Sequence, residues 1–323
     1  MKRLAAAIAM LCSVATFTAP ARAQAPADAQ NYPNQMVKII VAISPGSAAD
    51  LLARAAAEKL SQRWKQQVIV ENRPGVAGIA AAAKSPADGY TLYLSANGHV
   101  VLGETNQNLP FDPIKDFTGV AQITTLPFVF ISSPTLSAKN LKEFIADAKQ
   151  RPGVMNYASA GYGSTAYLAA VLFTQAAGVN MTHVAYRGGP EAVMSVIRGD
   201  AQMYFATAYA AAELLDSGQV RGLAVTGPSR VPLVPKVPTF AEAGLPEFSY
   251  DTWFGVWAPA GTPDPIVQKV SRDLIAVMSE PEMKERLSKQ GMVIATKPAK
   301  EFNEMVKADS ARFISALRAV EKK

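Results

Sequence analysis

The sequence is almost without cysteine. Its single cysteine, Cys12, lies in a 23-residue leader with the three-part form of a secretory signal: Lys2 and Arg3, an apolar run over residues 4–14, and an A-x-A site at residues 21–23. We expect cleavage after Ala23. The mature chain then has no thiol, which excludes disulfides, cysteine-ligated zinc and a cysteine nucleophile.

Long apolar runs are also absent. The run in the leader is well short of the roughly 20 residues that span a bilayer, and no comparable run follows it. We therefore expect a protein that is secreted through a cleaved signal peptide and remains soluble in the periplasm.

Basic tracts are equally scarce. The formal charge of the full chain is +6, but the leader carries three of the basic residues and no acid, so the mature charge is +3. The longest basic tract is Lys322-Lys323, whereas a nucleic-acid-binding protein would cluster Lys and Arg on one face. We expect no nucleic-acid partner and a monomer.

Only two histidines, His99 and His183, are present. Serine catalysis needs a general base, and no G-x-S-x-G elbow occurs. Histidine and carboxylates do not cluster at metal-ligand spacing either. We expect neither a metal nor a cofactor nor an enzyme; a secreted hydrolase with Ser164 or Ser47 as nucleophile is the alternative.

The sequence is rich in alternating strand and helix patterns. Residues 36–43, "QVIVE" and "YTLYLS" read as strands, and helical spacing follows the first of them over 48–64. This alternation predicts a parallel α/β sheet. It restarts at 127 and continues to about 250. Within this run, at residues 228–239, four prolines in "PSRVPLVPKVPT" predict an extended surface loop.

Two alternating runs in one chain predict two lobes. We assign 24–126 plus 251–323 to the first lobe and 127–250 to the second. The chain would then cross between lobes near 125–130 and 250–256. Two lobes joined by a double crossing form a clamshell, which closes on a ligand by hinge motion.

Two glycine-containing loops follow predicted strands, "SPGSAAD" at 44–50 and "SAGYGST" at 159–165. Parallel sheets bind ligands at this edge, and a helix N-terminus holds an anion through unpaired N–H groups. The alternative is that Ser47 with Asp50, and Ser164 or Thr165, only cap their helices. One such loop in each lobe favours a small carboxylate held from both sides.

The second loop also matches a dinucleotide fingerprint, Gly161-x-Gly163-x-x-Ala166. The acidic residue expected about 20 positions later is missing from "AAGVNMTHVAY", so we rank this interpretation low. Several aromatic residues lie near the strand ends of the second lobe, and we expect two or three of them to line the pocket: Tyr162, Tyr167, Tyr204, Phe205 and Tyr209.

A set of motifs occurs in order along nearly all of the mature chain: "SPGSAADLLARAAAEKL", "VIVENRPGVAGIAAA", "PADGYTLYL", "LPFDPIKDFTGV", "YASAGYGSTAYLAA", "HVAYRGG", "VPTFAEAGLP" and "WFGVWAPAGTP". Together they resemble the Bug family of extracytoplasmic solute receptors, which serve tripartite tricarboxylate transporters. The resemblance implies a two-lobed α/β periplasmic binding protein fold, a type II-like clamshell with two crossings between the lobes. It also implies an organic acid ligand and membrane permease subunits as partners. A ligand sensor for a two-component kinase is an alternative use.

The resemblance also implies ligand-binding residues in the two loops: Gly46, Ser47, Ala48, Ser159, Gly161, Gly163, Ser164 and Thr165. From their positions in or near these loops and the nearby strand ends, we add five further candidates: Asp50, Asn97, Tyr162, Tyr204 and Ala206. Three of this chain's residues depart from the usual pattern. Ser47 replaces a glycine, Tyr167 stands where a histidine is frequent, and Ala206 stands where many relatives have an aspartate. Without that aspartate to pair with an amine, we expect a dicarboxylate or aromatic acid that carries no ammonium group.

Overall fold

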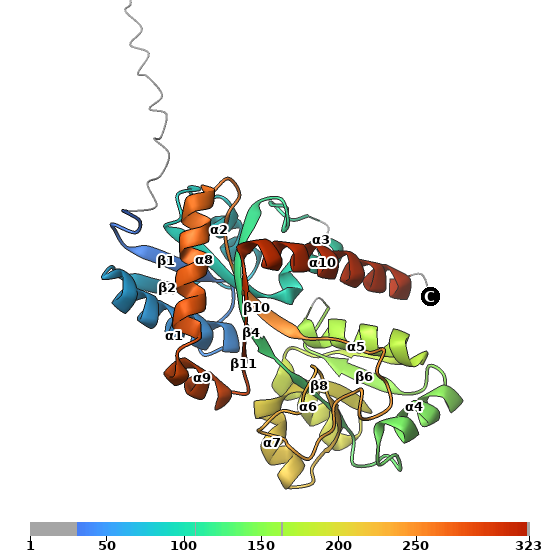
Figure 1. The fold of residues 1–323 in the computed structure, drawn as a ribbon. Coiled ribbons are helices and arrows are strands. Elements are labelled where there is room, and N and C mark those ends of the chain that lie inside the picture. Colours follow the sequence, from blue (N-terminus) through green and yellow to red (C-terminus); the bar gives the residue numbers. More distant parts are fainter. Residues whose placement is uncertain (1–30, 107, 163, 322–323) are drawn as a thin grey trace, which may run out of the picture.

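The computed structural model describes residues 31–106, 108–162 and 164–321; the predicted leader and Gly163 lie outside them. The chain forms two lobes, each built on its own β-sheet (Figure 1). This confirms the predicted two-lobed α/β fold. None of the helices in these ranges is both long and apolar enough to cross a membrane.

Lobe 1 contains a six-stranded sheet in the order β11-β4-β10-β3-β1-β2. Strands β1 (Val37–Val41), β2 (Val68–Asn72) and β3 (Thr91–Ala96) are parallel. Strand β10 (Thr252–Pro259) runs antiparallel to both β3 and β4 (Phe117–Leu126), and β11 (Val293–Pro298) runs antiparallel to β4. The first four strands therefore all end at one edge of the sheet.

Lobe 2 contains a five-stranded sheet in the order β7-β6-β8-β5-β9. Strands β6 (Asn156–Ser159), β7 (Thr182–Ala185) and β8 (Met203–Thr207) are parallel. Strand β5 (Phe128–Ser132) is antiparallel to β8 and to β9 (Arg221–Val225). Since β4 ends at 126 and β5 begins at 128, the carboxyl edges of the two sheets meet across this crossing.

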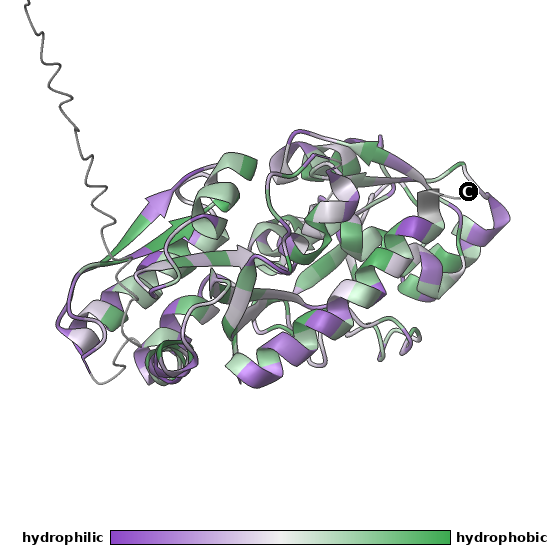
Figure 2. Cartoon of the chain, turned by 90° about the horizontal axis from the view of Figure 1, so that it is seen from above, coloured by the Kyte–Doolittle hydropathy of each residue, from purple (hydrophilic) through white to green (hydrophobic). Residues whose placement is uncertain are grey.

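Helices cover both faces of each sheet. In lobe 1, α1 (Ala48–Trp64) and α8 (Asp264–Met278) share one core, and α2 (Val76–Ala83) and α10 (Ala299–Glu321) pack on the other face. Lobe 2 has α4, α5, α6 and α7, at Leu141–Gln150, Thr165–Ala177, Gly189–Arg198 and Ala208–Asp216. Most helix ribbons carry both purple and green residues in Figure 2, as expected when one side of a helix is buried.

Three short elements complete the described fold. They are η1 (Asn97–Val101), α3 (Leu102–Thr105) and α9 (Pro281–Ser288). The strands of lobe 1 lie within 37–126 and 252–298, and those of lobe 2 lie within 128–225. The exact lobe limits given above, 24–126 plus 251–323 and 127–250, remain a proposal.

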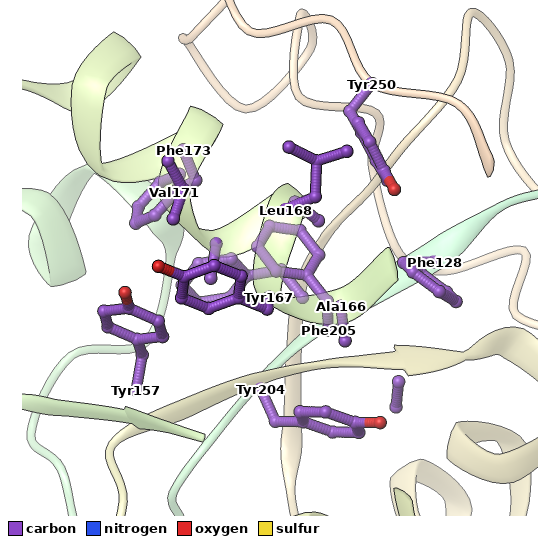
Figure 3. Packing of buried hydrophobic residues seen from close by; sticks show 14 of the residues in the cluster. Phe128, Tyr157, Ala166, Tyr167, Leu168, Val171, Phe173, Tyr204, Phe205 and Tyr250 are labelled. Atoms are coloured by element: carbon purple, nitrogen blue, oxygen red, sulfur yellow. The ribbon is translucent and has the colours of Figure 1, made fainter. Parts of the chain in front are cut away.

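Side chains near the second crossing connect the lobes. The hydroxyl of Tyr250 donates to the carbonyl of Thr165 at the start of α5 (2.9 Å), and the side-chain amide of Asn97 donates to Tyr250 Oη (3.3 Å) and to the carbonyl of Asp251 (3.0 Å). Figure 3 shows Tyr250 and Phe128 beside this end of α5. The long helix α10 also reaches lobe 2, where Gln175 donates to the carbonyl of Ala316 (2.7 Å).

The structure corrects two expectations about the chain. Alternation predicted parallel pairing, but both sheets are mixed, because β5, β10 and β11 run antiparallel to their neighbours. The proline-rich stretch is free of helix, as predicted, but it is not confined to the surface. Its residues Val231, Val234 and Val237 are buried against the core of lobe 2, since this lobe has an otherwise open edge at β9.

His99 is enclosed in lobe 1 by three rings, those of Tyr93, Phe117 and Trp257, at centroid distances of 5.2, 5.0 and 5.0 Å. Burial lowers the pKa of His99 to about 4, from an ordinary value of 6.5. Between pH 4 and pH 6.5, His99 is therefore protonated in the unfolded chain and neutral in the folded chain. Stability is therefore complete above pH 6.5 and falls as the pH drops toward 4.

We expect the His99→Phe variant to lose less stability than the wild type on acidification. Moving from pH 7 to 4.5 should cost the wild type on the order of 2 kcal/mol more than the variant, since one pKa unit corresponds to about 1.4 kcal/mol. Urea unfolding of both proteins at the two pH values measures this. Equal losses in the two proteins would contradict the assignment.

Candidate functional site

The first candidate loop joins β1 to α1. Ser47 is the N-cap of α1, and its hydroxyl accepts from the amide of Asp50 (3.3 Å). Gly46 has a φ of +80°, which favours glycine, and its amide donates to Asp50 Oδ2 (2.9 Å). This leaves the amides of Ala48 and Ala49 without an acceptor among the described residues.

Asp50 faces inward and holds the loop in place. The residue is 2% exposed, and its side chain accepts from Gly46, from Arg54 Nε (3.1 Å) and from Asn72 Nδ2 (2.9 Å). Burial alone would raise the pKa of Asp50, but these donors outweigh it and hold the pKa below its usual range. Every contact of this carboxylate is thus with the protein, which favours a structural role over a ligand contact.

The second candidate loop joins β6 to α5. Ser164 is the N-cap of α5, and its hydroxyl accepts from the amide of Tyr167 (3.2 Å). Ser164 N–H itself donates to the carbonyl of Gly161 (3.2 Å), a glycine with φ of +101°. The amides of Thr165 and Ala166 have no acceptor in the described part of the chain, and this mirrors the arrangement at α1.

His183 holds the second loop from the neighbouring strand β7. Its Nε2 lies 2.7 Å from the hydroxyl of Ser159, which also accepts from the amide of Gly161 (3.0 Å). Burial lowers the pKa of His183 to about 4, so the ring is neutral near pH 7. Ser159 is fully buried and His183 Nδ1 has no described partner, so this pair lacks both the exposed nucleophile and the carboxylate of a catalytic triad.

Two further helices begin at the same edge of lobe 2. Helix α7 follows β8 and is capped by Thr207, whose hydroxyl accepts from the amide of Ala210 (3.2 Å). Helix α6 follows β7 and begins after Gly188 with no side-chain cap. Thr207 was not among the residues predicted from the sequence, although a threonine between a strand and a helix is an N-cap signal.

The structure divides the predicted site residues into accessible and buried groups. Those at least partly exposed at the carboxyl edges are Gly46, Ser47, Ala48, Gly161, Tyr162, Ser164 and Thr165. Four others are fully or almost fully buried and make internal contacts: Asp50, Asn97, Ser159 and Ala206. Tyr204 is 7% exposed, and Gly163 lies outside the described residues.

The starts of α1 and α5, where these accessible residues lie, can bind an anion. A helix N-terminus carries about half a positive charge and offers N–H donors, and the hydroxyls of Ser47 and Ser164 accept from their helices while keeping an O–H to donate. Such an edge suits an anion that makes no covalent bond to the protein. Two hinged lobes with anion-binding helix ends on facing edges are typical of a solute-binding protein.

The chain belongs to the tripartite tricarboxylate transporter receptor family, because residues 52–321 match its sequence model, described as "TctC: Tripartite tricarboxylate transporter family receptor". This confirms the family suggested by the sequence motifs. The family consists of periplasmic solute receptors, and the protein is accordingly a receptor and not an enzyme.

Relatives and solved structures agree with this family. Protein BugT of Bordetella pertussis (strain Tohama I) is 34% identical over 294 residues, or 89% of this chain and 90% of BugT. R. palustris Rpa4515, solved with adipate, is 30% identical with a TM-score of 0.75, covering 89% of this chain and 98% of that chain. MatC (Rpa3494) from Rhodopseudomonas palustris, solved with bound malate, is 28% identical with a TM-score of 0.72, covering 88% and 99%.

Proposed function

We propose that this receptor captures a small organic carboxylate between its lobes. It does so in the periplasm, after removal of residues 1–23, and delivers the acid to the membrane permease subunits of a tripartite transporter. The ligand's carboxylate lies against the starts of α1 and α5 and contacts the backbone of Ala48 and Thr165 and the hydroxyls of Ser47 and Ser164.

One observation carries this proposal: α1 and α5, one in each lobe, both begin with a serine cap and with two amides that find no acceptor among the residues that the structure describes. A carboxylate between them would satisfy donors from both lobes and favour the closed clamshell. Malate and adipate, bound by two similar proteins, are both small dicarboxylates. Because position 206 is an alanine, we propose an acid without an ammonium group.

Titration with a panel of acids tests the proposal. We expect at least one of succinate, malate, adipate, citrate or terephthalate to bind in calorimetry and to raise the unfolding midpoint by roughly 5 °C at 100 times its Kd. Trp253, which is buried beside the second crossing, should report closure through its fluorescence.

The uncharged diamide of the bound acid is the control. It has the same shape but no negative charge, so it should not bind. A panel in which no acid binds, or in which the diamide binds as tightly as the acid, would overturn carboxylate capture.

A further inference from the structure

We infer that the start of α6, with Arg187 and Tyr204, forms a second carboxylate seat, and that the protein therefore selects dicarboxylates over monocarboxylates. This inference rests on the proposed function, because the first carboxylate must occupy the starts of α1 and α5. Arg187 was not among the residues singled out from the sequence.

The start of α6 lacks the cap that the neighbouring helices have. Its N-cap is Gly188, which has no side chain to offer, whereas α1, α5 and α7 are capped by Ser or Thr hydroxyls. The amides of Gly189 and Glu191 have no acceptor in the ranges that the structure describes. An external acceptor can therefore approach these amides, and the paired glycines keep the backbone open to it.

Tyr204 independently indicates a ligand at this place. It lies on β8, on the opposite side of the strand ribbon from Phe205 in Figure 3, and is 7% exposed. Its hydroxyl makes no hydrogen bond within the described residues, and a Cβ on Gly189 would lie 3.3 Å from it. Burial raises the pKa of Tyr204 to about 12, so the hydroxyl keeps its proton and can donate to a carboxylate.

Arg187 supplies the charge at this seat. Its amide donates to Glu191 Oε2 (3.0 Å), which fixes the loop and engages that carboxylate, while its exposed guanidinium forms no ion pair with any described residue. Arginine offers a planar pair of N–H groups that matches a carboxylate in two-point contact. The Arg187 side chain leaves the chain two residues before the amide of Gly189, and the Tyr204 hydroxyl lies next to Gly189. Together these groups are complementary to a second carboxylate.

The second seat lies next to the first. The amide of Tyr186 donates to the carbonyl of Ser159 (2.9 Å), and a Cβ on Gly161 would lie 3.9 Å from the carbonyl oxygen of Tyr186. The loops after β6 and β7 are thus in contact, so a short carbon chain can place one carboxylate at each seat. A monocarboxylate leaves Arg187 and Tyr204 without partners and gains nothing from them.

Matched acid pairs test the inference by calorimetry: succinate with butyrate, adipate with hexanoate, and terephthalate with benzoate. We expect the wild type to bind the best diacid at least about tenfold more tightly than its monoacid. Arg187→Gln should weaken that diacid by about tenfold or more and leave the monoacid within twofold. Tyr204→Phe, which removes only the hydroxyl, should weaken the diacid by several-fold.

Arg198→Gln is the matched control, since Arg198 lies at the far end of α6 and pairs with Asp200 (2.8 Å). It should leave both affinities unchanged, and unfolding midpoints will show that all variants fold. Equal binding of diacid and monoacid by the wild type, or equal losses for both acids in Arg187→Gln, would overturn the second seat while leaving carboxylate capture intact. Failure of every acid to bind would overturn both proposals.

Discussion

Ser164→Asp is expected to abolish tight binding of the acid without destabilising the protein. Aspartate is as good an N-cap as serine, so it can accept from the amide of Tyr167 as Ser164 does at 3.2 Å. It also places a negative charge on the donors proposed to hold the ligand. Two like charges about 4 Å apart repel by about 4 kcal/mol at an effective dielectric constant near 20. We expect the affinity to fall at least 100-fold in calorimetry.

Asn140→Asp is a matched control for this charge. Asn140 caps α4, where its side chain accepts from the amide of Glu143 (2.9 Å), and α4 follows β5 at the opposite edge of the lobe 2 sheet. The substitution adds the same charge to the same kind of position, away from the proposed ligand. Affinity should stay within twofold. If Ser164→Asp also bound the acid within threefold of the wild type, the start of α5 would not be the carboxylate seat.

The parts of the fold that could be predicted are those with a local pattern. Strands β1 and β3 are runs of apolar and β-branched residues followed by helical spacing or a turn, and the sequence places them within two residues. Strands β4 and β11 were not predicted. Both contain polar residues, such as Gln122 and Thr124 in β4. They are strands because of pairing across the sheet, where β4 lies between β10 and β11 and β11 pairs with β4. Such pairing is tertiary and leaves little local signal.

The site shows the same division between local and tertiary information. Gly46 and Ser47 stand between a strand and a helix, so the loop and its cap could be inferred from their order. The inward orientation of the Asp50 side chain could not be inferred, because it depends on a hydrogen bond from Asn72, which lies on β2. Asn97 was predicted to contact the ligand, but its amide is engaged by Tyr250 and Asp251.

Arg187, which we propose to bind the second carboxylate, leaves no pattern in the sequence. A single arginine in a glycine-containing turn has no characteristic spacing. Its significance comes from the position of β7 beside β6, from the buried Tyr204 of β8, and from the absence of a described ion pair. Each of these facts belongs to the folded chain.

Asp50→Ala should have the largest effect on stability of the substitutions considered. The carboxylate is buried and accepts from Gly46, Arg54 and Asn72, so its removal leaves three donors without their partner. Solvent screens the pairing with Arg54, whose side chain is about half exposed, so most of the cost comes from the donors that lose their acceptor. At about 1 kcal/mol or more for each donor, the loss is roughly 3 kcal/mol of unfolding free energy. Because the pKa of Asp50 is held below its usual range, its stabilisation is complete above about pH 4 and is lost as the pH falls further.

Asp147→Ala is the control for Asp50→Ala. Asp147 also pairs with an arginine four residues later on its helix, Arg151, but its side chain is 24% exposed, whereas that of Asp50 is 3% exposed. Surface pairs of this spacing contribute only about 0.5 kcal/mol. Urea unfolding at pH 7 should therefore separate the two variants by more than 2 kcal/mol, since desolvation is what distinguishes their carboxylates. If the two variants lost equal stability, the network around Asp50 would not be what holds the first ligand loop.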